Sequence, residues 1–214
     1  MSTTTLDPAS IAAGIAHLRA ADPAMARAID AVGPCTLTLQ GDHYLALVEA
    51  IVSQQISIKA AASILARVVA LRAPEATLTP DHLAAASEEE LRAVGCSRAK
   101  AIYLQDLSTR VVAGWLDLAA LRHLPDEEII AQLLAVKGIG RWTAEMFLIS
   151  SLGRPDVWPV DDLGIVIAAQ GLYALPTRPK PKELLALGEP LRPYRTLAAW
   201  YLWQHRRCLL EMPW

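Results

Sequence analysis

The chain has 214 residues, enough for one large domain or two small ones with a core that needs no disulfide bonds. Hydrophobic residues make up 53% of it, with one Phe and many Ala and Leu, and this composition favours helices over strands. The net charge of -2 excludes a global positive field, so a nucleic-acid partner has to be met by a local basic patch, and the charge alone fits a cytosolic protein that binds a small molecule.

The front half of the chain reads as a series of capped helices. Asp-Pro pairs at residues 7–8 and 22–23 each begin a helix, and Asp42 is placed to cap a third. Residues 35–41 alternate in polarity, but without a partner strand they predict an extended linker. The helices expected in this half cover 8–20, 23–33, 43–55, 58–72, a segment that begins at 80, and 88–95, where Ser87 and Glu90 have capping-box spacing.

The second half continues the helical pattern. The expected helices cover 98–115, 126–136, 141–150, 163–173 and 194–211, separated by proline-containing loops at 154–162 and 176–183. The sequence therefore predicts an all-α fold with about ten or more short helices. No segment has about 18 consecutive apolar residues, and the N-terminus lacks the pattern of a signal peptide, so we expect no membrane association.

The three cysteines, Cys35, Cys96 and Cys208, are odd in number and far apart in the sequence. They argue against a disulfide framework and for a reducing compartment. No CxxC pair occurs, so thiolate zinc sites and iron–sulfur clusters have no ligands. A cytoplasmic protein is expected, of bacterial type, or a nuclear one in a eukaryote.

A glycine-rich turn separates two helices in the segment "LLAVKGIGRWTA". Glycine costs about 1 kcal/mol against Ala inside a helix, so two glycines one residue apart mark a special backbone. Amides at the start of the second helix, with its dipole, favour an anion such as a nucleic-acid phosphate. A tight turn with incidental basic residues is equally compatible with the spacing. The predicted phosphate-binding residues are Lys137, Gly138, Ile139, Gly140, Arg141 and Thr143.

This segment, together with "RPDVWPVDDLGI" downstream, resembles the helix-hairpin-helix (HhH-GPD) superfamily of DNA glycosylases, in which a Gly/Pro-rich loop ends in Asp. The most similar branch is that of the alkylbase glycosylases, 3-methyladenine DNA glycosylase II, and the resemblance runs from Leu45 to Trp203. It implies two helical lobes with the active site between them and no N-terminal β domain. One lobe would comprise residues 1–40 and 153–214. The other would comprise 41–152, with the hairpin at about 129–152.

Breaking a base–sugar bond leaves a positively charged, oxocarbenium-like sugar, which a fixed carboxylate near C1′ stabilises. The same carboxylate can orient or deprotonate the attacking water. The resemblance implies that Asp162 is this catalytic residue. Asp161 is expected to cap the following helix, as Asp often does, and is the alternative catalytic residue.

The resemblance also implies a base pocket. Relatives that cut the DNA backbone have a Schiff-base lysine where this chain has Trp142, so we expect a monofunctional hydrolase without lyase activity. Electron-rich rings attract a positively charged alkylated purine, and six Trp against one Phe fit such a pocket. The pocket residues implied are Trp142, Trp203 and Met146, the last in place of a Tyr of the best-known relatives. Trp158, Trp200 and Tyr201 are weaker candidates, and the last two are expected in the core.

A base that leaves the duplex leaves a gap in the stack, which an inserted side chain can fill. The segment "AIVSQQISIKAAASILARV" resembles the family's wedge segment, and the resemblance implies that Gln55 is the inserted residue. Gln54 and Gln55 are equally suited to cap a helix end. Residues 94–101 resemble a second, poorer hairpin, or a plain helix boundary. The acidic runs at 87–91 and 125–129 are expected on solvent faces that point away from DNA.

The function that the resemblance implies is removal of alkylated bases, such as 3-methyladenine and 7-methylguanine, from double-stranded DNA in base excision repair. We expect a monomer that needs no cofactor and no catalytic metal, with a structural Na⁺ or K⁺ allowed at the hairpin backbone. Three alternatives stay open: a non-catalytic helix-hairpin-helix DNA-binding protein, a related glycosylase for another lesion, and a helical protein that binds a small molecule.

Overall fold

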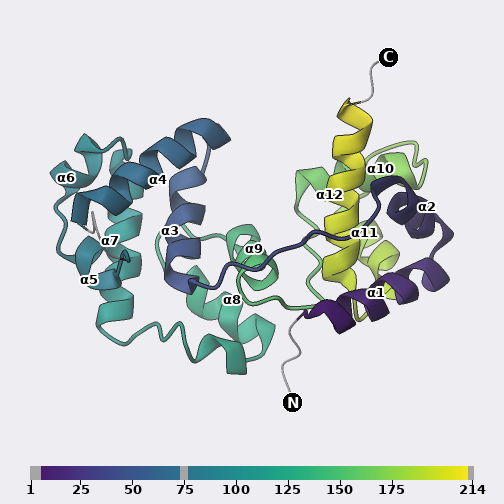
Figure 1. Cartoon of the computed structure of the whole chain (residues 1–214), viewed down its shortest axis with the longest axis horizontal. Helices are drawn as coiled ribbons and strands as arrows, with labels where there is room; N and C mark the ends of the chain where they lie inside the picture. The colour runs from purple at the N-terminus through teal and green to yellow at the C-terminus, as the bar shows by residue number, and fades with distance from the viewer. Residues whose placement is uncertain (1–5, 73–76, 212–214) are drawn as a thin grey trace. The chain divides into compact units, whose positions relative to one another are not determined.

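The computed structural model describes residues 6–72 and 77–211, and every regular element in these ranges is a helix (Figure 1). The predicted all-α fold is therefore confirmed. The chain divides into two compact units, one of Met1–Leu39 with Leu148–Trp214 and one of Gln40–Phe147. The expected lobes changed over at 152/153, whereas the units change over at 147/148, inside a continuous helix. Sequence patterns find the end of a helix, but a division of packing within a helix leaves no such signal.

Unit 1 contains both ends of the chain. Its helices are α1 (Pro8–Ala21), α2 (Pro23–Val32), α10 (Leu163–Leu172), α11 (Pro181–Gly188), the 3-10 helix η2 (Glu189–Leu191) and α12 (Arg195–Glu211). The long helix α12 packs against α1, α2 and α10. Trp158, Trp200 and Tyr201 all lie in this core, as was expected for the last two.

Asp22 organises the start of unit 1, because one side chain serves three donors. Its Oδ1 atom accepts the amides of Ala24 and Met25 at 2.7 and 3.1 Å and caps α2. Its Oδ2 atom accepts the hydroxyl of Tyr173 at 2.7 Å, from the end of α10. The Asp-Pro signal thus marks the helix start and also joins two segments far apart in the sequence.

Unit 2 carries the middle of the chain. Its elements are α3 (His43–Ser53), α4 (Ile58–Arg72), α5 (Pro80–Ala84), α6 (Glu88–Ala93), α7 (Arg98–Val112), η1 (Leu121–His123), α8 (Asp126–Leu134) and the start of α9 (Arg141–Ser150). Helix α7 packs against α3, α5 and α6. The predicted capping box is confirmed, since Ser87 accepts the amide of Glu90 and the Glu90 carboxylate accepts that of Ser87.

No helix within 6–72 and 77–211 is both long enough and apolar enough to cross a bilayer. All three cysteines are free thiols, with Cys96 buried. Within the same ranges, no group of three or more His, Cys, Asp or Glu side chains is arranged to hold a metal ion.

Candidate active site

The turn between α8 and α9 contains the two glycines singled out by the sequence, and they differ in kind. Gly138 has φ +80°, and a Cβ there would lie 2.1 Å from Cδ2 of Tyr103. Its lack of a side chain is therefore required by the turn and by packing. At Gly140 a Cβ would meet no atom within 4 Å among residues 6–72 and 77–211, apart from its two chain neighbours. Packing within these residues therefore does not require glycine at position 140, and the backbone there is open to a ligand.

The backbone of this turn presents hydrogen-bond donors. The amide of Ile139 donates to the carbonyl of Val136 at 3.2 Å. The amides of Gly138 and Gly140 donate no hydrogen bond within the described part of the chain. Amides in the first turn of α9 have no acceptor inside the helix. Since the side chains of Ile139 and Thr143 are buried, these residues can serve a ligand only through their backbone. The arrangement suits an anion at a helix N-terminus.

The two basic side chains of the turn already have carboxylate partners. Nζ of Lys137 lies 3.8 Å from Oδ1 of Asp106 and is mostly exposed. The guanidinium of Arg141 binds both oxygens of Glu127 at 2.6 and 3.1 Å and also Glu145 at 3.1 Å. The hydrogen bond from Arg141 holds the pKa of Glu127 below its ordinary value. Arg141 therefore lends little net charge to the turn, and Lys137 is the more accessible of the two predicted cations.

One acidic run supplies a partner to the hairpin. Within residues 125–129, which were predicted to lie on a solvent face, Glu127 is exposed and pairs with Arg141 of the hairpin. At residues 94–101, which resemble either a second hairpin or a plain helix boundary, Nζ of the buried Lys100 donates to the carbonyl of Val52 at 2.7 Å. Lys100 therefore binds a carbonyl in the last turn of α3 and is not placed to bind a phosphate.

Asp106 anchors the turn, a role that the sequence did not indicate. Its Oδ2 atom accepts the amide of Lys137 at 3.0 Å and Nε of Arg110 at 2.8 Å. Burial raises the pKa of this carboxyl, but the Lys137 amide and the Arg110 guanidinium outweigh burial and hold the pKa below the usual 3.8. An acid with a depressed folded-state pKa stabilises the fold above its unfolded pKa and loses that contribution as the pH falls through the folded value.

We therefore expect Asp106→Asn to lower the free energy of unfolding by about 1–2 kcal/mol at neutral pH. The deficit should shrink as the pH falls below 3.8, where the unfolded carboxyl becomes protonated, and it should disappear below the lowered folded-state pKa of Asp106. Urea unfolding at about pH 7 and about pH 3 measures both values. Glu128→Gln, at an exposed carboxylate of the same unit, is the matched control. A deficit that is equal at both pH values would contradict a role for the Asp106 charge.

The predicted wedge lies in the turn from α3 to α4, and this turn is tied to the hairpin. Gln55 is exposed and has φ +57°, a left-handed conformation that non-glycine residues seldom adopt and that is often found at functional sites. Its neighbour Gln54 is the C-cap of α3 and donates from Nε2 to the carbonyl of Gly138 at 2.9 Å. Ile58 nearby is 91% exposed, an unusual value for an apolar side chain. The turn that carries the predicted wedge is thus joined by a hydrogen bond to the predicted phosphate-binding turn, within unit 2.

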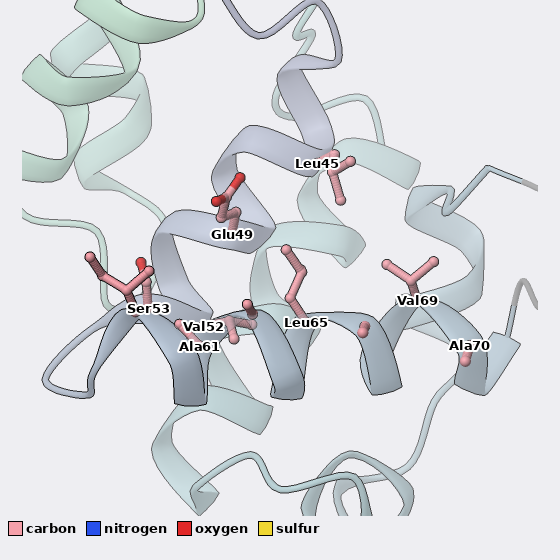
Figure 2. A pocket seen from close by; sticks show the side chains of 11 residues that line it. Leu45, Glu49, Val52, Ser53, Ala61, Leu65, Val69 and Ala70 are labelled. Atoms are coloured by element: carbon pink, nitrogen blue, oxygen red, sulfur yellow. The ribbon is translucent and has the colours of Figure 1, made fainter.

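A groove of about 660 Å³ runs along α3 and α4 beside this turn (Figure 2). Figure 2 shows Leu45 and Glu49 on α3 and Leu65 and Val69 on α4 among its lining side chains. The lining is almost entirely apolar, and none of the predicted catalytic, pocket or phosphate-binding residues belongs to it. The groove is therefore separate from the candidate active site.

Asp162 is nearly buried, at 8% exposure, and is the N-cap of α10. Its Oδ1 atom accepts the amide of Ile165 at 2.8 Å. The prediction that Asp161 caps this helix is wrong, because Asp161 is exposed and Asp162 makes the capping bond. Either residue of an Asp-Asp pair satisfies the sequence signal, and only the backbone path of the loop decides between them.

The loop that ends in Asp162 is fastened to the start of α12. Oγ1 of Thr196 accepts the amide of Val157 at 3.0 Å and donates to the carbonyl of Arg154 at 2.6 Å. Arg195, itself buried, binds both carboxylate oxygens of Asp156 at 2.7 and 3.0 Å. The loop is therefore held at several points, which fixes the approach of the chain to Asp162.

The predicted pocket residues are distributed over the two units. Trp142, in the first turn of α9, is 48% exposed, and Met146 on the same helix is partly buried. Both belong to unit 2, whereas Trp203 belongs to unit 1, where its Nε1 atom donates to Oδ1 of Asp162 at 2.9 Å. Unit 1 thus joins one predicted pocket residue to the predicted catalytic residue, and unit 2 joins the hairpin to the wedge.

These features define a helix-hairpin-helix protein. The sequence model of the HhH-GPD superfamily base excision DNA repair proteins matches residues 48–193, which is more than half of the chain. The chain belongs to this family.

Individual relatives match over nearly the full length. DNA-3-methyladenine glycosylase 1 of Schizosaccharomyces pombe is 36% identical over 192 residues, covering 88% of this chain and 84% of that protein. The alkylbase DNA glycosidase-like protein mag2 of the same yeast is 32% identical, covering 88% and 90%. The solved structure of the S. pombe 3-methyladenine DNA glycosylase Mag1 in complex with abasic DNA has a TM-score of 0.80 at 35% identity, covering 90% of this chain and 95% of that one. A DNA-3-methyladenine glycosidase from Bacillus halodurans has a TM-score of 0.83 at 36% identity, covering 99% and 94%.

Proposed function

We propose that the protein is a monofunctional DNA glycosylase that removes alkylated purines, such as 3-methyladenine and 7-methylguanine, from double-stranded DNA and leaves an abasic site. The relatives named as 3-methyladenine DNA glycosylases support the reaction class. The observation that carries the proposal in this chain is Asp162, a nearly buried carboxylate held by hydrogen bonds at the end of an anchored loop.

The proposed reaction breaks the bond between C1′ and the base nitrogen, and the electron pair of that bond leaves with the base. An alkylated purine that starts as a cation leaves as a neutral molecule, which makes it a good leaving group. The carboxylate of Asp162 stabilises the positive charge that develops on the sugar. Water adds to C1′, and Asp162 orients it and accepts its proton.

The remaining parts bind and expose the lesion. The turn of Gly138, Ile139 and Gly140 holds a phosphate of the strand through its amides. Gln55 fills the space that the extruded nucleotide leaves in the stack. Trp142, with its exposed ring, attracts the positively charged base. Its place at the position of the lysine in strand-cutting relatives supports hydrolysis without strand cleavage.

The decisive test is release of free base from duplex DNA methylated with dimethyl sulfate, followed by chromatography of the released bases. We expect 3-methyladenine and 7-methylguanine as products, and no covalent complex with abasic DNA after borohydride treatment. Tight DNA binding without base release would favour a non-catalytic DNA-binding protein instead. Release of another lesion from a panel of modified duplexes would keep the reaction class and change the substrate.

A further inference from the structure

Trp203 and Asp162 meet although they lie 41 positions apart in the sequence. The indole Nε1 of Trp203, on α12, donates to Oδ1 of Asp162 at 2.9 Å. The same oxygen accepts the amide of Ile165 at 2.8 Å, from the first turn of α10. The two helices pack against each other in unit 1. Two donors from different directions therefore act on one carboxylate oxygen.

Gly164 provides an independent observation at the same place. A Cβ at this position would lie 2.9 Å from Oδ1 of Asp162, 3.2 Å from Cδ1 of Trp203 and 3.4 Å from its Nε1. A side chain here would enter the space where the indole reaches the carboxylate. The first turn of α10 thus has no side chain at position 164, where the Trp203–Asp162 hydrogen bond forms. Glycine is a poor helix former, so helix propensity does not account for it.

A carboxylate stabilises a developing cation best when its orientation is fixed beforehand, because no reorganisation is then needed during the reaction. The capping bond to Ile165 attaches Oδ1 to the first turn of α10. The indole N–H adds a second attachment from another helix, and the ring of Trp203 is itself held by this bond. A Trp that serves only as a stacking surface needs no such bond.

We propose that Trp203 is a positioning residue that orients the carboxylate of Asp162 through its indole N–H, and that Gly164 is the clearance that allows this contact. The inference rests on the proposed function and assigns Trp203 a role other than stacking on the base. Phe at position 203 keeps an aromatic ring but has no donor, so Trp203→Phe separates the two roles.

The test uses single-turnover release of 7-methylguanine by the full chain, with binding to two DNA duplexes measured in parallel. One duplex carries a neutral tetrahydrofuran abasic mimic, and the other carries a cationic pyrrolidine that imitates the charged sugar. We expect Trp203→Phe to lower the rate and the affinity for the pyrrolidine duplex about 10- to 100-fold, while the affinity for the tetrahydrofuran duplex stays unchanged. Trp200→Phe, a buried Trp on the same helix, is the control and should lower neither.

Two further variants keep the test decisive. Gly164→Ala retains the indole but displaces it, so it should reproduce the effect of Trp203→Phe if the contact matters. In an Asp162→Asn background, Trp203→Phe should cause no further loss of rate. Equal losses of affinity for both duplexes, a wild-type rate in Trp203→Phe, or an undiminished effect in the Asp162→Asn background would each overturn the inference. A wild-type protein that releases no base would overturn the proposed function as well.

Discussion

Asp162→Asn is expected to lower base release from methylated DNA by at least about 100-fold, with folding and DNA binding retained. In the proposed mechanism the carboxylate charge stabilises the sugar cation, and the amide of Asn carries no charge. Single-turnover release of 7-methylguanine measures the rate, and binding to an abasic-site duplex measures the affinity. The expected loss is the largest effect on activity of any single change in this chain.

The fold should survive this substitution because Asn and Asp are about equally good N-caps. The amide oxygen of Asn can still accept the amide of Ile165 and the indole N–H of Trp203, the two bonds that Asp162 makes through Oδ1. Asp161→Asn is the matched control, since it removes the same charge from the adjacent, exposed residue. Equal loss of activity in both variants would mean that the general negative charge of the loop matters, and full activity in Asp162→Asn would refute the proposed mechanism.

The second large effect is expected at the hairpin, where the two glycines should respond differently. Gly138→Ala places a Cβ in a left-handed backbone and within 2.1 Å of the Tyr103 ring. We expect it to lower the free energy of unfolding by about 2–4 kcal/mol, from backbone strain and overpacking together. Urea unfolding at neutral pH measures this loss, and DNA binding should fall with it because the turn changes shape.

Gly140→Ala is the matched variant, because a Cβ there meets no atom within 4 Å in the described part of the chain beyond its two neighbours. Its stability should stay within about 0.5 kcal/mol of the wild type. Its affinity for an abasic-site duplex should still fall about tenfold, since the methyl group would stand between the turn amides and a phosphate. Wild-type affinity in Gly140→Ala would show that the backbone at this position does not approach the DNA.

Local signals in the sequence predicted most of the helices, but not α11 (Pro181–Gly188), which begins inside the predicted loop 176–183. Asp-Pro pairs and the Ser87–Glu90 capping box act within one turn of helix, so neighbouring residues are enough to predict them. Trp200 and Tyr201 were expected in the core because Trp and Tyr on helices of this kind are usually buried, and the structure confirms it. The turn of glycines and the loop that ends in Asp162 were found because their spacing resembles that of a known family.

The contacts that organise the candidate site lie beyond such signals. Gln54 binds Gly138 across 84 positions, Asp106 binds Lys137 across 31, and Trp203 binds Asp162 across 41. Polar pairs of this kind produce no periodicity, because the residues around one partner in the sequence do not indicate the other. The choice between Asp161 and Asp162 as the helix cap failed for a related reason, since it depends on how the loop arrives at α10.

The hydrogen bond from Gln54 to the carbonyl of Gly138 has a consequence for how this protein would read a strand. Under the proposed function, it would set a constant offset between the nucleotide whose phosphate the turn binds and the base step that Gln55 enters. Different side chains at position 55 can then be exchanged to suit different lesions without altering that offset. The Gln54–Gly138 hydrogen bond would thus fix the spacing, while the side chain at position 55 could vary.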